Sequence, residues 1–200
     1  MNINTRPLDE LIHIDAKFSP TQSNIETAIE NNQFSLYYQP LIDLPKGELV
    51  GFEGLLRWTH PEFGMTLPDV FIPIAEETGQ INQLTHLAID TGFKFIEALN
   101  PELSFSINIS TKSMTDDHLI EALDHSCHEF NIDPHRVVLE FTGSVDMETP
   151  THAEGVLKQL KVNGFRLGID DTGTGPSMSP SATTHFSELK IDRSLIASMA

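Results

Sequence analysis

Short apolar runs alternate with longer amphipathic segments through the second half of this chain, and this alternation limits the fold more than any other feature. The apolar runs have the length and residue types of strands, and the segments between them have helical periodicity. We expect strands at 103–110, 136–142, 165–171 and 187–192, and helices at 116–130, at 150–162 and from Arg193 onward. Nearly continuous apolar strands joined by helices belong to a parallel sheet that helices cover. The sequence therefore predicts an α/β fold.

The first part of the chain has a different pattern. Aromatic and β-branched residues dominate 34–42 and 48–58, and Pro45-Lys46-Gly47 between them is typical of a turn. Two strands this close in sequence pair as an antiparallel hairpin. We also expect helices at 23–32, with a capping box from Ser23 to Glu26, and at 68–77 and 81–98, separated by Gly79. Residues 1–19 are expected to be an N-terminal extension, and 20–200 a single domain.

Polar residues lie in or at the end of several predicted strands. In a β/α barrel the carboxyl ends of the strands meet at one rim, so these side chains are expected to converge. Acids and an amide offer only hard oxygen ligands, which suit Mg²⁺ or Mn²⁺ better than Zn²⁺. One such residue alone is more often a cap or a surface group, but the ordered set indicates a metal site. The set is Glu53, Asn108, Glu140, Asp170 and Asp171, with Lys190 placed to orient a water.

Composition excludes several classes of protein. The formal net charge of −17 argues against direct binding to nucleic acid, which requires lysine and arginine to neutralise phosphates. The sequence contains neither a membrane-spanning apolar run nor a signal peptide. A single cysteine, Cys127, leaves no intrachain disulfide. We therefore expect a cytoplasmic protein that does not associate with membranes.

Several motifs occur in an order that resembles one known family. They are YYQPLIDLPKGELVGFEGLLRW, HPEFG, FIPIAEETGQI, SINIS, VLEFTGS, LGIDDTGTG and LKIDRS, between about residues 34 and 197. Together they closely resemble the EAL-domain family of cyclic di-GMP phosphodiesterases. The signature tripeptide stands here as Glu53-Gly54-Leu55, with glycine in place of the usual alanine.

The resemblance implies a TIM-type β/α barrel whose first strand is antiparallel, and hydrolysis of cyclic di-GMP to pGpG with Mg²⁺ or Mn²⁺. Within this family Glu53, Asn108, Glu140 and Asp170 correspond to ligands of the first metal, and Asp171 to a ligand of the second. Lys190 resembles the lysine that holds the catalytic water, and acts with Glu53 as the catalytic pair. Contacts to the nucleotide are implied for Gln39, Leu55, Arg57 and Asp171.

The chain departs from the family pattern in three places. Gly143 stands where the family has a second glutamate, and the usual DDFGTGYSS loop is altered from Asp171 to Ser177. The sequence ends at Ala200, before the family's seventh and eighth strands and the general-base glutamate. If the sequence is a fragment of a longer gene, this third departure does not count against activity; if it is the whole product, a partner covers the open edge or the protein is a remnant. We expect metal and nucleotide binding with weak or no turnover. The alternative is a noncatalytic cyclic di-GMP sensor or interaction module, with a homodimer or a regulatory protein as partner.

Overall fold

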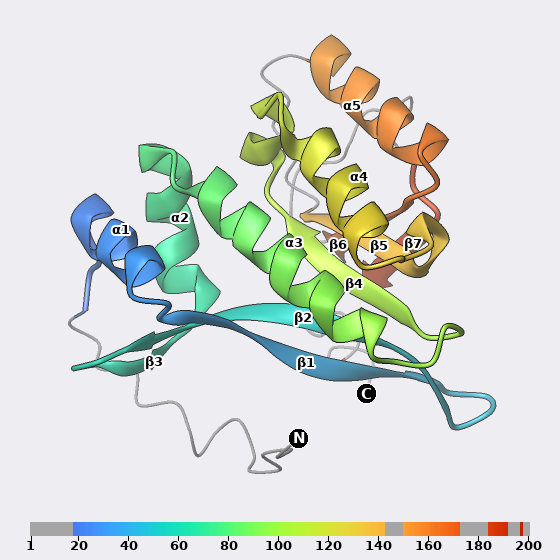
Figure 1. The fold of residues 1–200 in the computed structure, drawn as a ribbon, viewed down its shortest axis with the longest axis horizontal. Coiled ribbons are helices and arrows are strands. Elements are labelled where there is room, and N and C mark those ends of the chain that lie inside the picture. Colours follow the sequence, from blue (N-terminus) through green and yellow to red (C-terminus); the bar gives the residue numbers. More distant parts are fainter. Residues whose placement is uncertain (1–17, 143–149, 173–183, 192–196, 198–200) are drawn as a thin grey trace.

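The computed structural model describes residues 18–142, 150–172, 184–191 and 197 (Figure 1). Most of the predicted N-terminal extension, Gly143, most of the altered loop and all of the predicted last helix except residue 197 lie outside these ranges. Within them the strands and helices alternate as the sequence predicts.

The chain begins with a helix and an antiparallel hairpin. The helix α1 (Gln22–Glu30) leads into β1 (Phe34–Asp43), which pairs antiparallel with β2 (Glu48–His60) from Phe34↔Trp58 to Asp43↔Glu48. Gly47 closes the turn with a φ of 68°, a conformation that favours glycine. The predicted hairpin is therefore confirmed. A third short strand, β3 (Gly64–Thr66), pairs with the end of β2 and was not predicted.

The rest of the chain follows the expected alternation. Two helices, α2 (Pro68–Thr78) and α3 (Ile81–Glu97), are separated by Gly79, which ends α2 with a φ of 86°. Then come β4 (Ser104–Ile109), the 3₁₀ turn η2 (Thr111–Thr115), α4 (Leu119–Glu129), the turn η3 (Pro134–Arg136), β5 (Val137–Thr142), α5 (Pro150–Val162), β6 (Arg166–Thr172) and β7 (Glu188–Ile191).

Two local predictions were wrong. The capping box of α1 joins Thr21 and Asn24, not Ser23 and Glu26: Asn24 Oδ1 accepts from Thr21 N at 2.9 Å, and Thr21 Oγ1 accepts from Asn24 N at 3.3 Å. Helix α4 starts at Leu119 rather than at residue 116, because the preceding residues close η2 and Asp116 is extended.

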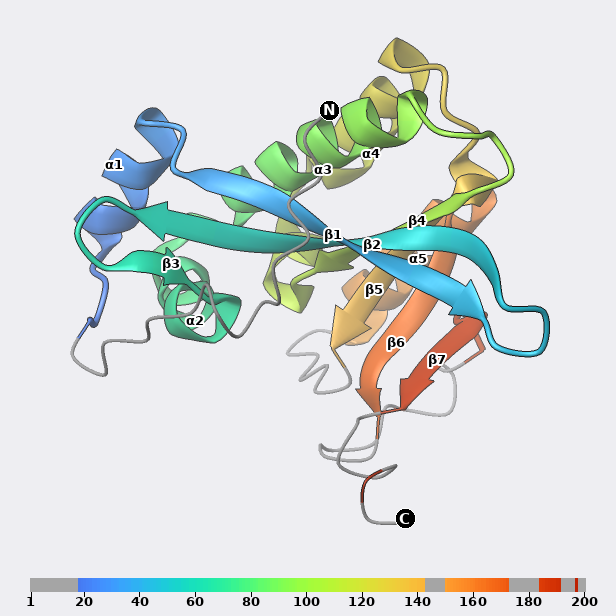
Figure 2. The same ribbon diagram turned by 90° about the horizontal axis from the view of Figure 1, so that it is seen from below.

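The strands form one curled sheet in the order β1-β2-β4-β5-β6-β7, with β3 beside β2. All neighbours from β2 through β7 along this path are parallel. The strand direction turns steadily across the sheet, so that β5, β6 and β7 cross the direction of the hairpin (Figure 2). Among the described strands β1 and β7 stand at the two ends of this order, and β3 pairs only with β2. The fold is thus an open part of a β/α barrel with an antiparallel first strand, as predicted.

Helices α2 to α5 cover the convex face of this sheet (Figure 1). Alternate residues of the central strands point into the helices and form the core, among them Phe105, Ile107, Leu139, Phe141 and Leu167. The intervening residues, among them Glu53, Asn108, Glu140 and Asp170, therefore lie on the concave face. No helix in the described ranges is long and apolar enough to cross a lipid bilayer.

Candidate functional site

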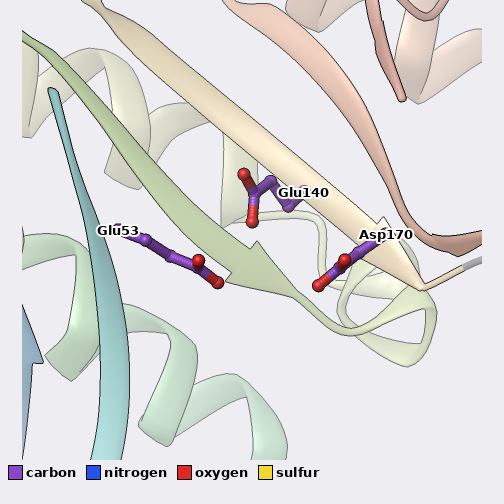
Figure 3. Close-up of side chains that lie close together, drawn as sticks. All are labelled: Glu53, Glu140 and Asp170. Atoms are coloured by element: carbon purple, nitrogen blue, oxygen red, sulfur yellow. The ribbon is translucent and has the colours of Figure 1, made fainter. Parts of the chain in front are cut away.

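Three carboxylates converge on the concave face of the sheet. Glu53 comes from β2, Glu140 from β5 and Asp170 from β6, and one oxygen of each lies within 4.8 Å of the others (Figure 3). Oxygens on opposite sides of one Mg²⁺ lie about 4.2 Å apart, so this spacing fits a single small ion. Glu53 and Glu140 are only 9% and 2% exposed, so water alone does not compensate their charges. The donor set therefore fits a hard divalent cation.

The register of the strands explains why these residues meet. Glu53 is level with Ser106, Asn108 is level with Glu140, and Asp170 is level with Thr142, two residues further on. From β2 to β6 each site residue therefore lies at the same level as the one before it or further toward the carboxyl ends of the strands, as expected for the tilted strands of a barrel.

Glu53 lies in the middle of β2, although its partners lie near strand ends. The pairing of β2 explains this difference: β2 pairs with β4 only over 51–54, and its later residues pair with β1 and β3. Glu53 is therefore near the carboxyl end of the part of β2 that belongs to the parallel sheet.

Asn108 and Lys190 complete the cluster. Asn108 Nδ2 donates to Glu53 Oε1 at 3.2 Å. Lys190 Nζ lies 2.9 Å from Glu53 Oε2 and forms a second ion pair with Glu140. The residues that the sequence predicted as first-metal ligands, together with the predicted lysine, thus lie in one group.

The charges in this group are strongly coupled. Burial raises the pKa of Glu140 to about 7; Lys190 and a hydrogen bond from Ser106 oppose the rise, and Glu53 adds to it. Burial disfavours the ammonium form of Lys190, but the two glutamates outweigh it and hold the pKa of Lys190 above its ordinary value. The two glutamates thus favour the charged form of Lys190, whereas burial favours the neutral form of Glu140.

The predicted nucleotide contacts lie beside the carboxylates on the hairpin. Leu55 and Arg57 follow Glu53 at alternate positions of β2, and Gln39 lies directly opposite Glu53 on β1. Gln39 is exposed, whereas Arg57 is only 6% exposed. Arg57 Nη1 donates to the carbonyl of Leu56 at 2.8 Å, and its buried Nε has no hydrogen-bond partner within the described ranges. Burial lowers the pKa of Arg57, while nearby acids, Glu53 among them, favour its charged form.

A cavity of about 350 Å³ opens beside the cluster, between β2, β4 and the helices α2 and α3. Its deeper walls are mostly apolar and come from α2, α3 and the two strands. Its polar lining includes Glu53, Asp69, Glu76, Asn108, Ser110 and Asp170. Leu55 also lines this cavity, which places one predicted nucleotide contact beside the carboxylates.

Two small residues support the site and were not singled out in the sequence. Ser106 hydrogen bonds to Glu140, and Gly168 leaves room for the same side chain, since a Cβ at Gly168 would lie 3.3 Å from Glu140 Cγ. A glycine inside the apolar run FRLGIDD was the available signal, because glycine within a strand often marks a close approach.

The structure explains why position 54 of the signature tripeptide is a glycine. A Cβ at Gly54 would lie 2.7 Å from Cζ of Phe105, a fully buried ring on β4. The same ring also approaches Gly92 of α3, where a Cβ would lie 2.4 Å from Phe105 Cε1. Phe105 thus packs against two glycines, and Gly54 is needed for this arrangement.

Part of the predicted site lies outside the described structure. Asp171 is in β6, but the surroundings of its side chain are not described. Gly143 and residues 173–177 of the altered loop lie outside as well. The second-metal role of Asp171 stays a prediction.

Comparison with known proteins places this geometry in a family. The family model for the EAL domain matches residues 22–200. MucR of Pseudomonas aeruginosa, a bifunctional diguanylate cyclase/cyclic di-GMP phosphodiesterase, is 30% identical over 205 residues, which cover all of this chain and 28% of MucR. The chain spans about a quarter of the length of the first curated relatives it matches.

Solved structures show the same fold. The PaMucR phosphodiesterase in complex with c-di-GMP superposes with a TM-score of 0.79 at 30% identity, over 88% of this chain and 74% of that one. The Bacillus subtilis YkuI protein, which has an EAL domain and was solved with c-di-GMP and calcium, matches with a TM-score of 0.72 at 21% identity, over 88% of this chain and 44% of that one. At that identity YkuI supports the fold alone. This chain therefore belongs to the EAL-domain family.

Proposed function

We propose that this chain binds one Mg²⁺ or Mn²⁺ ion through Glu53, Glu140 and Asp170, and binds cyclic di-GMP beside that ion. The observation that carries the proposal is the convergence of the three carboxylates within 4.8 Å. The named activity of MucR and the c-di-GMP in the PaMucR structure support the choice of ligand.

The residues around the carboxylates suit a phosphodiester. The guanidinium of Arg57 is buried on the hairpin beside Glu53, and a phosphate oxygen would satisfy its Nε. Leu55 and Gln39 would contact the rest of the nucleotide. As a ligand, Asn108 would present its amide oxygen in place of the nitrogen that now donates to Glu53. A bound divalent ion would stabilise charge on the attacking and leaving oxygens during hydrolysis to pGpG.

The first candidate function is weak hydrolysis of cyclic di-GMP. The second is binding of cyclic di-GMP without turnover, and one observation favours it. The ammonium of Lys190 is shared between Glu53 and Glu140, so it is less available to position a water. A sensor or interaction module needs the binding residues but not that function of Lys190. We propose weak hydrolysis at most.

One experiment separates the two candidates. The protein is incubated with Mn²⁺ and cyclic di-GMP, binding is measured by calorimetry, and pGpG is measured by chromatography. Product that disappears in Glu53→Ala supports an enzyme, and metal-dependent binding without product supports a sensor. Absence of both contradicts the proposal. The cytoplasmic location and the homodimer or protein partner stay predictions that fractionation and light scattering would test.

A further inference from the structure

The strand that carries Asn108 is fixed just beyond that residue by a side chain from another element. Ser110 follows the end of β4 and caps η2, its hydroxyl accepting from Lys112 N at 3.1 Å. The same hydroxyl donates to Glu76 Oε1 of α2 at 2.6 Å. Glu76 therefore joins helix α2 to the exit of β4.

The turn η2 is also held against α3. The buried hydroxyls of Thr85 and Ser113 hydrogen bond at 3.1 Å. The ring of His86 also lies near the turn, with 3.1 Å between Nε2 and Asp116 Oδ2, although Nε2 makes no hydrogen bond within the described ranges. These contacts lie between the turn and α3, whereas Glu76 of α2 is hydrogen bonded to Ser110, the residue that caps the turn. The polar contacts at the start and end of η2 thus involve two different helices.

Glu76 is close to the proposed metal site as well as to the turn. It lines the cavity together with Glu53, Asn108 and Ser110. Asn108 is exposed and is two residues from Ser110, about 7 Å along an extended chain. A displacement of Ser110 would therefore also move the amide of Asn108 relative to Glu53.

We propose that Glu76 is a positioning residue for Asn108: through Ser110 it holds the exit of β4 so that the amide faces Glu53 and the ion. This inference rests on the proposed function. Outer partners of this kind set the orientation of a ligand, and their loss commonly weakens metal affinity about 10-fold or more.

The test uses Mn²⁺ alone, so that it does not depend on turnover. The full chain is titrated with Mn²⁺, and the free ion is followed by its electron paramagnetic resonance signal. The variants are Glu76→Ala, Glu76→Gln, Ser110→Ala and the double variant Glu76→Ala/Ser110→Ala. Glu77→Ala, an exposed glutamate at the next position of α2, is the matched control. Melting curves in EDTA establish that each variant is folded.

We expect Glu76→Ala and Ser110→Ala each to weaken Mn²⁺ binding about 10-fold, with no further loss in the double variant. Glu76→Gln keeps an oxygen that accepts from Ser110, so it should bind Mn²⁺ nearly as well as the unmodified chain, as should Glu77→Ala. Unchanged Mn²⁺ affinity in Glu76→Ala, or equal losses of Mn²⁺ affinity in Glu76→Gln and Glu76→Ala, would overturn the positioning role of Glu76 but not the metal site. Absence of Mn²⁺ binding by the unmodified chain would overturn the metal site and this inference with it.

Discussion

Lys190 forms an ion pair with Glu140 although a whole strand separates their own two strands. Lys190 is on β7 and Glu140 on β5, and between them β6 presents Gly168, which is level with Glu140. The absence of a side chain at Gly168 leaves space beside Glu140. The lysine, the carboxylates and the intervening glycine thus form one unit of the concave face.

Replacement of Lys190 tests whether its ammonium group and the metal ion compete for Glu53 and Glu140. Lys190→Met leaves two carboxylates facing each other without a cation, so the free energy of unfolding in EDTA should fall by about 3 kcal/mol. This is the low end for a buried pair, because Lys190 is 30% exposed and Glu140 can take up a proton. Mn²⁺ no longer competes with the ammonium, so its affinity should rise about 10-fold. Lys158→Met, an exposed lysine of α5, is the control. Weaker Mn²⁺ binding in Lys190→Met would contradict competition.

The raised pKa of Glu140 makes stability depend on pH. Since this pKa is about 7 in the folded protein against 4.5 for an ordinary glutamate, the folded state binds the proton more tightly than the unfolded state. The free energy of unfolding should therefore fall as pH rises through this window. The side chain in Glu140→Gln has no proton to lose in this range, so its free energy of unfolding should depend less on pH. Denaturant midpoints in EDTA between about pH 5 and pH 8 measure this dependence.

The control for this measurement is Glu77→Gln, which is exposed on α2 and should leave the slope unchanged. The pKa of Lys190 is raised from its ordinary value of 10.5, so Lys190 keeps its charge and its contribution to stability throughout this range. An equal slope in Glu140→Gln and the unmodified chain would show that Glu140 does not titrate there.

Metal binding should follow the same carboxyl group. Mn²⁺ must displace the proton from Glu140 below its pKa of about 7, so the affinity should increase with pH up to that value and then level off. Titrations of the unmodified chain at several pH values measure this dependence. A pH-independent affinity below neutrality would argue that Glu140 is not a ligand.

Restoring the family's usual alanine at position 54 should destabilise this chain. In Gly54→Ala the new Cβ meets the ring of Phe105, which is fully buried and also in close approach to Gly92. Such overpacking costs about 1–3 kcal/mol. Adding Phe105→Leu should reduce the combined loss below the sum of the single losses, as thermal or denaturant unfolding would show.

A second glycine offers the matched control. Gly155 is in α5, and a Cβ there meets nothing within 4 Å. Gly155→Ala should therefore gain up to about 1 kcal/mol from helix propensity. Equal effects of Gly54→Ala and Gly155→Ala would contradict the packing account.

Most of the fold follows from local patterns in the sequence. The apolar runs, Gly47 and Gly79 mark strands and helix ends through their own chemistry, so their positions were predicted within a few residues. The capping box of α1 was misplaced because Thr21 and Ser23 are both suitable caps, and only the chain path selects Thr21. Strand β3 was missed because three residues carry no periodicity of their own.

The site was predictable where its residues belong to strand ends, and less so where tertiary pairing decides. Glu53 is mid-strand in sequence, and the short pairing of β2 with β4 makes it part of the rim. Glu76 and Ser110 come from segments 34 residues apart, and their contact depends on how α2 packs near η2. No spacing rule in the sequence links them.

The central claim is that Glu53, Glu140 and Asp170 hold one divalent ion. It is tested by titrating Mn²⁺ into the unmodified chain and into Glu53→Gln, Glu140→Gln and Asp170→Asn, with the free ion measured by electron paramagnetic resonance. A single site whose affinity falls in all three variants, with Glu77→Gln unchanged, is the predicted result. Undetectable binding by the unmodified chain, or an affinity that none of the three substitutions weakens, would contradict it.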